Sequence, residues 1–218
     1  MISEAERYRR EKARLPVPDE VYHASPDSSL KQLEPRVSTH GAPWVYAAID
    51  LALSATQLSS WGGDFSCWTG RYGDRPIHVC ERFPGAFDRR YAHRSGSIYV
   101  LPGKTFRRGK TSFTEEVVSE VSVWVLREID VPDVKAYLLQ LEQETRLRIL
   151  YYPERFPGIP EDDQDLVDRA VMGAQQPGNR VLEFVREYHS HLVERILAGI
   201  ERAKSSAEEE NSECSSEN

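Results

Sequence analysis

The feature that most constrains the fold of this chain is a change of sequence pattern at about residue 132. Between Glu20 and Pro132, short runs rich in Val, Ile, Tyr, Phe and Trp are interrupted every 8–15 residues by Gly, Pro, Asp or Ser, which is typical of strands joined by turns. After Asp130 the apolar residues follow helical spacing instead. The pattern predicts an α+β protein, with a β-rich core followed by a helical extension.

The element boundaries follow from the same runs and breaks. We expect strands at residues 20–24, 43–47, 65–69, 76–82, 97–101, 115–119 and 121–127. Helices are expected at residues 3–14, 50–61, 132–148, 163–173 and 179–204, with either a short helix or a long loop at 85–95. The predicted divisions are an N-terminal helix and linker (1–18), a core (19–131), a helical extension (132–204) and a tail (205–218). The tail holds five glutamates, no cation and no apolar periodicity, so it is expected to be disordered.

Composition excludes several classes of protein. No apolar run approaches the roughly 20 residues that span a bilayer, and the first residues lack the apolar stretch of a secretory signal. A cytoplasmic protein without a membrane anchor is therefore expected. Its three cysteines, Cys67, Cys80 and Cys214, are odd in number and far apart, which predicts neither a disulfide framework nor a metal site.

The formal net charge of −7 conceals a basic segment. Residues 71–110 carry ten basic and three acidic side chains, with aromatic residues between them, a combination that suits nucleic-acid phosphates and unstacked bases. A solvated surface is the alternative interpretation. The arginines that would bind nucleic acid are Arg71, Arg75, Arg82, Arg89, Arg90, Arg107 and Arg108.

Three local motifs follow one another in the β-rich region. His23-Ala24-Ser25 closes the first predicted strand, and Tyr46 in the second strand is followed by Ser54-Ala55 in a helix. Glu116-Val117-Val118-Ser119 opens a late strand. Taken singly, His23 could be a surface group, Tyr46 a core aromatic residue and Glu116 part of a solvent-facing edge.

In this order, the motifs resemble those of the ADP-ribosyltransferase superfamily, in its His–Tyr–Glu branch of poly(ADP-ribose) polymerases and diphtheria-toxin-like proteins. The chain looks like a divergent small bacterial or phage-type member, and the resemblance covers about residues 20–130. It implies a split mixed or antiparallel β core with flanking helices, and NAD as the substrate. Ala24 replaces the glycine of the family motif, and Gln57 stands where the polymerases have a second stacking tyrosine.

The resemblance also implies roles for individual residues. Glu116 would stabilise the positive charge that develops on the ribose as the nicotinamide bond breaks. Tyr46 would stack on nicotinamide and Ser54 would bind its carboxamide. On the other side, His23 and Ser25 would bind ribose hydroxyls, and Arg36 would contact the adenosine phosphate. Strand alternation places Glu115 and Glu116 on opposite faces, and Glu115 remains a second candidate for the catalytic carboxylate.

The leading hypothesis is a toxin-like mono-ADP-ribosyltransferase that transfers ADP-ribose from NAD to a nucleic acid or a protein. The alternative is a catalytically silent module of the same fold that binds nucleic acid or a protein through residues 71–110. An RNA 2′-phosphotransferase is a further alternative within the same fold class, but it relies on a different arrangement of His and Arg residues that this sequence does not let us assemble. The C-terminal helices could close the core, form a dimer or bind a protein partner, and the sequence leaves these alternatives open.

Overall fold

Two compact units make up the structure, and the chain passes between them several times. The computed structural model describes residues 4–37, 41–71, 75–111, 113–176 and 180–216. Unit 1 comprises Met1–Ser60, Thr69–Val79 and Tyr91–Ile149, and unit 2 comprises Trp61–Trp68, Cys80–Arg90 and Leu150–Asn218. This division differs from the sequential one expected from the sequence, since residues 132–149 belong with the β-rich unit and residues 61–68 and 80–90 with the C-terminal helices.

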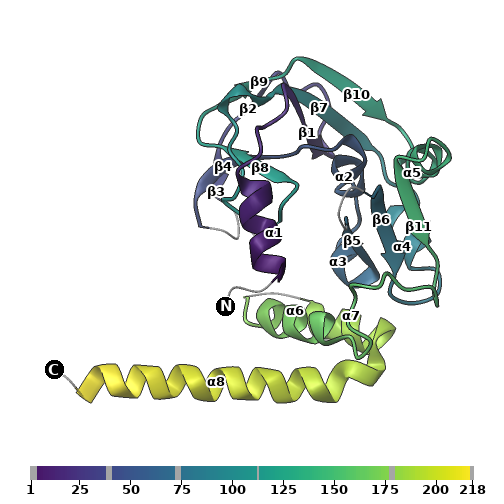
Figure 1. Cartoon of the computed structure of the whole chain (residues 1–218). Coiled ribbons are helices and arrows are strands. Elements are labelled where there is room, and N and C mark those ends of the chain that lie inside the picture. Colours follow the sequence, from purple (N-terminus) through teal and green to yellow (C-terminus); the bar gives the residue numbers. More distant parts are fainter. Residues whose placement is uncertain (1–3, 38–40, 72–74, 112, 177–179, 217–218) are drawn as a thin grey trace. The chain divides into compact units, whose positions relative to one another are not determined.

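An antiparallel sheet forms the centre of unit 1 (Figure 1). Its strands lie in the order β10 (Arg127–Val131), β7 (Gly96–Pro102), β1 (Glu20–Ser25), β4 (Pro43–Ala48) and β3 (Arg36–Val37), and β8 (Glu116–Ser119) also pairs with β4. Unit 1 further contains α1 (Glu4–Ala13), α2 (Leu51–Thr56), α5 (Val134–Gln143), the 3₁₀ turn η1 (Gly103–Thr105) and the pair β2 (Gln32–Leu33) and β9 (Val123–Trp124). The predicted α+β class is confirmed.

One face of this sheet is buried and the other carries polar groups. Val45, Ala47 and Val117 belong to a buried apolar cluster with Val21, Leu101 and other residues. Because side chains alternate along a strand, Tyr46 and Glu116 lie on the opposite face, where both remain half-buried. The candidate site is built on this second face.

Strands β1 and β4 diverge soon after they meet. Tyr22 opposite Ala48 is the pairing between them, whereas β1 pairs with β7 over all six of its residues. On its other edge β4 pairs with β8 from Val45 opposite Ser119 to Ala48 opposite Glu116. Beyond the Tyr22–Ala48 pair, the edge of β4 that faces β1 is therefore not paired with β1. Side chains can bond to the backbone groups of β4 there.

Helix α2 follows β4 directly and is fixed by its N-cap. The Asp50 carboxylate accepts hydrogen bonds from the backbone N–H groups of Ala52 at 2.8 Å and Leu53 at 3.3 Å, which satisfies donors that the first helical turn leaves free. Arg71 forms an ion pair with the same carboxylate. All six residues of α2 are buried, so the helix holds Ser54 in a fixed position relative to Tyr46.

Unit 2 is mainly helical. It contains α3 (Gly63–Ser66), most of α4 (Ala86–Tyr91), α6 (Gln164–Ala174), α7 (Val181–Tyr188), the 3₁₀ turn η2 (Ser190–Leu192) and α8 (Val193–Ser216). Phe65, Leu166, Ala170, Phe184 and Ile196 are among the residues of its apolar core. The chain passes between the units within a sheet of β11 (Leu147–Leu150), β6 (Ile77–Glu81) and β5 (Cys67–Gly70).

Several predicted strands and helices are corrected in the first part of the chain and around residue 145. The expected helix 132–148 ends at Gln143, where Thr145 takes a left-handed φ of 59°, and Leu147–Leu150 form strand β11 instead. The expected strand 65–69 begins at Cys67, because Phe65 and Ser66 close helix α3. The expected strand 121–127 is divided into β9 and the first residue of β10, and it begins late because the chain turns where the Ser119 hydroxyl donates to the Val121 carbonyl at 3.0 Å. The expected helix 50–61 ends at Thr56, with Gln57 as its C-cap.

Two further corrections concern the C-terminal helices. The predicted helix 179–204, whose first residue lies outside the described ranges, is interrupted where the buried His189 side chain donates to the Phe65 carbonyl at 2.7 Å. Helix α8 then runs through residues 205–216, where the sequence composition predicts disorder. After Gly199 this segment has no Gly or Pro, and Glu and Ala are good helix formers, so a helix already begun at Val193 continues.

Candidate functional site

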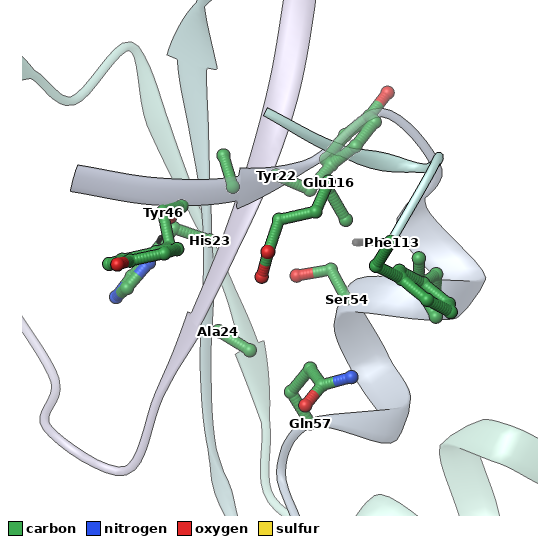
Figure 2. A pocket seen from close by; sticks show the side chains of 11 residues that line it. Tyr22, His23, Ala24, Tyr46, Ser54, Gln57, Phe113 and Glu116 are labelled. Carbon is green, nitrogen blue, oxygen red and sulfur yellow. Dashed lines mark hydrogen bonds between the residues drawn. The ribbon is translucent and has the colours of Figure 1, made fainter. Parts of the chain in front are cut away.

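The candidate site lies in unit 1, where β1 and β4 diverge. A pocket of about 200 Å³ opens on the polar face of the sheet, beside helix α2. Figure 2 shows, in one view, the Glu116 carboxylate and the Ser54 hydroxyl between Tyr46 and Phe113. The pocket is lined by Tyr22, His23, Ala24, Tyr46, Ala47, Ala48, Leu53, Ser54, Gln57, Phe113 and Glu116.

His23 bonds across the opening between the two strands. Its Nδ1 lies 2.7 Å from the carbonyl oxygen of Tyr46, which only accepts hydrogen bonds, so Nδ1 carries the proton. Burial lowers the pKa of His23, and this outweighs the Tyr46 hydrogen bond, which raises it; the charge of Arg36 lowers it further. The imidazole is therefore neutral near pH 7, with Nε2 available as an acceptor.

The position of the Tyr46 ring follows from the register of β4. It lies directly opposite Val118 of β8, and its ring meets that of Trp44 edge-on, with 6.0 Å between the centroids. The ring is half-buried and lines the pocket. It therefore offers a flat aromatic surface that is held in place from two sides.

Ser54 has a buried hydroxyl with an unused hydrogen-bonding capacity. The residue is 1% exposed, and its Oγ has no hydrogen-bond partner among the described residues. A buried polar group without a partner costs free energy, so its persistence at a pocket wall is typical of a group that binds a ligand. A polar ligand in this pocket would satisfy it.

The structure brings Glu116, and not Glu115, to the pocket. Glu116 begins β8 opposite Ala48 and is half-buried among the lining residues. Glu115 is 4% exposed and is not among those residues, and its carbonyl accepts a hydrogen bond from the Ile49 N–H at 3.0 Å. Strand alternation had separated the two glutamates, and the structure identifies the face that each occupies.

A second pocket adjoins the first along His23 and Tyr46, which line both. It has a volume of about 190 Å³ and contains Ser25 and Arg36. Ser25 is mostly buried, and its hydroxyl accepts a hydrogen bond from the Asp27 N–H at 3.1 Å. Arg36 is exposed on β3, opposite Trp44. The six predicted site residues are thus divided between two neighbouring pockets.

Sequence reasoning missed three aromatic residues of these pockets, Tyr22, Phe113 and Trp44. Phe113 is 38% exposed at the first pocket, and Trp44 lines the second. The signal for Phe113 is its position as an isolated aromatic residue in a polar loop, three positions before Glu116. Its backbone carbonyl accepts a hydrogen bond from the Glu116 N–H at 3.2 Å, so the loop and the glutamate are positioned together.

Most of the arginines predicted to bind nucleic acid are used within the protein. Arg71 bonds to Asp50, and Arg108 donates to the carbonyl groups of Pro16 and Thr114. In unit 2, Arg82 and Arg90 are buried, and Arg89 lies over the Phe184 ring, 4.3 Å from its centroid. Arg75 and Arg107 are exposed.

No group of three or more His, Cys, Asp or Glu side chains in the described ranges is arranged to hold a metal ion. Within the same ranges, none of the helices combines the length and apolar character that a membrane span requires.

Comparison with known proteins gives no relative for this chain. Neither a family model, nor a curated protein, nor a solved structure matches it.

Proposed function

We propose that the chain is an NAD-dependent mono-ADP-ribosyltransferase with an ADP-ribosyltransferase-like fold in unit 1. The observation that carries the proposal is the meeting of Tyr46, Ser54 and Glu116 in one pocket, beside His23. The three motifs are separated by 23 and 70 residues in the sequence. A chance resemblance gives no reason for their side chains to gather around one hollow.

The pocket that contains Tyr46 and Ser54 suits the nicotinamide ring. Tyr46 supplies an aromatic face on which a flat, positively charged ring can stack. The unpartnered hydroxyl of Ser54 can bond to the carboxamide and so lose the energetic cost of its burial. Ala24 has the same backbone N–H and C=O groups as the family glycine, although its methyl group occupies space that the glycine leaves open.

The neighbouring pocket suits the adenosine half of NAD. The neutral His23 imidazole, with its proton on Nδ1, can accept a hydrogen bond from a ribose hydroxyl at Nε2. Arg36 adds a positive charge at the same pocket, which Asp27 and Glu34 also line, and its guanidinium can bond to a phosphate. Because His23 and Tyr46 line both pockets, one dinucleotide can occupy the two.

Glu116 carries the chemistry in this proposal. The bond between ribose C1′ and the nicotinamide nitrogen breaks, and its electron pair leaves with nicotinamide, which becomes neutral. Positive charge develops on the ribose, and the Glu116 carboxylate stabilises it. An acceptor oxygen or nitrogen then bonds to C1′, and the proton that it loses passes to solvent or to the carboxylate.

Release of nicotinamide from NAD tests the proposal. The purified full chain should release nicotinamide, and Glu116→Gln should slow the release about 10²–10³-fold, the effect of removing one transition-state contact. Glu115→Gln is the matched control, because it changes the adjacent carboxylate outside the pocket, and it should keep the wild-type rate. Thermal melting of both variants verifies folding.

Two results would count against the proposal. If the wild-type chain neither binds NAD in calorimetry nor releases nicotinamide, the function is wrong and a silent binding module is favoured. If Glu116→Gln retains the wild-type rate, the carboxylate has been assigned incorrectly. Loss of activity in Glu115→Gln alone would point to the neighbouring residue.

A further inference from the structure

A third hollow of unit 1 lies farther along β8, beyond Glu116. It has a volume of about 310 Å³ and is lined by Lys104, Thr105, Arg107, Lys110, Glu120 and the Val118 side of the strand. Lys104, Arg107 and Lys110 are all exposed. We call these three residues the cation triad. The triad faces one carboxylate among the lining residues, that of Glu120, so the hollow keeps an excess of positive charge.

The charges of the cation triad are not used within the described part of the chain. None of its three members forms an ion pair or a side-chain hydrogen bond with a residue of the described ranges. Arg108, within the same stretch, donates instead to two backbone carbonyl groups. The triad is thus a part of the basic segment whose charge is directed to solvent.

The backbone holds this hollow in a fixed shape. Arg107 and Val118 exchange two backbone hydrogen bonds, at 2.9 Å and 3.1 Å. The hydroxyl groups of Thr105 and Ser119 are hydrogen-bonded at 3.1 Å. In the turn before Lys104, a Cβ on Gly103 would lie 1.8 Å from the Pro18 carbonyl oxygen, so only glycine fits there. The cation triad therefore lies on a surface that backbone hydrogen bonds and close packing hold in place.

Strand register places Arg107, the central member of the cation triad, on the same face as Glu116. Val118 lies opposite both Tyr46 and Arg107, and directly opposed residues point to the same face. Glu116 and Val118 also share that face, because they are two positions apart, or about 7 Å along the strand. A chain of phosphates held at the triad would therefore pass close to the catalytic carboxylate.

We infer that the cation triad binds the phosphates of a single-stranded nucleic acid and presents one nucleotide to Glu116 as the acceptor of ADP-ribose. This inference rests on the proposed function for the transfer step. Exposed Phe113, at the Glu116 pocket (Figure 2), offers a ring on which an unstacked base can lie. A duplex would keep its bases stacked and away from such a ring.

Binding of a labelled oligonucleotide tests this surface. The probe is a fluorescein-labelled single-stranded dodecamer, in DNA and RNA forms, and the protein is the full chain. The triple variant Lys104→Gln, Arg107→Gln and Lys110→Gln should lower the slope of log K against log salt by about 2, or 0.7 for each phosphate that is no longer neutralised. At 0.1 M salt the same change corresponds to about a hundredfold weaker binding.

A matched control separates the hollow from general charge. The variant Arg94→Gln, Arg146→Gln and Arg148→Gln removes the same number of positive charges from exposed positions of unit 1 outside the hollow. Its affinity for the dodecamer should stay within about threefold of wild type, because exposed charges that do not contact the oligonucleotide contribute little to binding. Release of nicotinamide in the absence of oligonucleotide should be unchanged in both triple variants.

The outcomes distinguish this inference from the proposed function. If the chain cleaves NAD but the triad variant binds the dodecamer as wild type does, the inference is overturned while the function stands. Equal competition by polyglutamate, or tighter binding of a duplex, also overturns it, in favour of an acidic protein or double-stranded partner. If the triad binds single strands but NAD is not cleaved, the surface stands and the transfer step falls.

Discussion

Within the basic segment 71–110, the stretch from Arg82 to Lys110 uses the positive charges at its two ends in opposite ways. In unit 2, Arg82 is buried, with Nη2 2.7 Å from Asp163 and Nη1 2.8 Å from Asp165. In unit 1, Lys104, Arg107 and Lys110 are exposed around a hollow and form no ion pair with a described residue. One end of the segment therefore stabilises the fold, and the other is available for a ligand.

This difference shows why a count of charges does not identify a binding surface. A guanidinium taken out of water needs a carboxylate or several carbonyl oxygens around it, and Arg82 finds two carboxylates about eighty positions later in the chain. Arg90 is likewise buried and donates to the Cys67 carbonyl at 2.7 Å. Charges without such partners are the ones to which the inference above assigns phosphates.

The largest expected effect comes from removing Arg82. Arg82→Met should lower the free energy of unfolding by about 3–5 kcal/mol, because Asp163 and Asp165 lose the cation that compensates them in a mostly buried position. Arg107→Met is the matched control, and this exposed change should stay within about 0.5 kcal/mol. Urea denaturation followed by circular dichroism measures both. Equal losses in the two variants would remove the distinction between the two ends.

Acid should reduce the stabilisation that the ion pairs of Asp163 with Arg82 and Arg155 give to the fold. Burial alone would raise the pKa of Asp163, but the hydrogen bond from Arg155 and the charges of Arg82 and Arg155 lower it below its ordinary value. The unfolded chain therefore binds the proton more readily. The contribution of Asp163 is complete above the unfolded pKa, near 4, and is lost as the pH falls through the folded pKa.

Asp163→Asn isolates that contribution. Asp163 has a φ of 57°, a left-handed conformation that asparagine also tolerates, so the substitution removes the charge without adding backbone strain. The free energy of unfolding, measured in urea between pH 3 and pH 6, should fall less steeply with acid in the variant than in wild type. An unchanged slope would mean that other groups control the acid response of this region.

The sequence predicted the strands that carry the site, but not the partners of their side chains. The strands at 20–24, 43–47 and 97–101 are confirmed as β1, β4 and β7, since apolar runs bounded by turns identify strands locally. The bond from His23 to the Tyr46 carbonyl was not predictable, because it depends on the divergence of β1 from β4. Alternation separated Glu115 from Glu116, yet only the packing of β8 on β4 identifies which face holds the pocket.

The division into units was harder to predict for a related reason. The sequence pattern changes once, near residue 132, whereas the chain passes between the units several times. Phe65 joins the core of unit 2 through the bond from His189, 124 residues later. The disorder predicted for the C-terminal tail was wrong because composition takes no account of the helix that precedes the tail. Helix α8 is nucleated at Val193, so extending it through the glutamates needs no new nucleation.

The smallest expected effect is also the most selective one. Replacing arginine by lysine keeps the charge but loses the planar fork that makes two parallel bonds to a carboxylate. Arg82 uses that fork, with Nη1 and Nη2 each 2.8 Å from an oxygen of Asp165, so Arg82→Lys should lower the free energy of unfolding by about 1–2 kcal/mol.

A phosphate in an open hollow needs mainly a point charge. Arg107→Lys should therefore leave the free energy of unfolding within about 0.5 kcal/mol of wild type and oligonucleotide affinity within about threefold, as measured by urea denaturation and fluorescence anisotropy. A large drop in oligonucleotide affinity in Arg107→Lys would show that the exposed end also depends on a fixed two-point contact, and that it is built more like Arg82 than its exposure indicates.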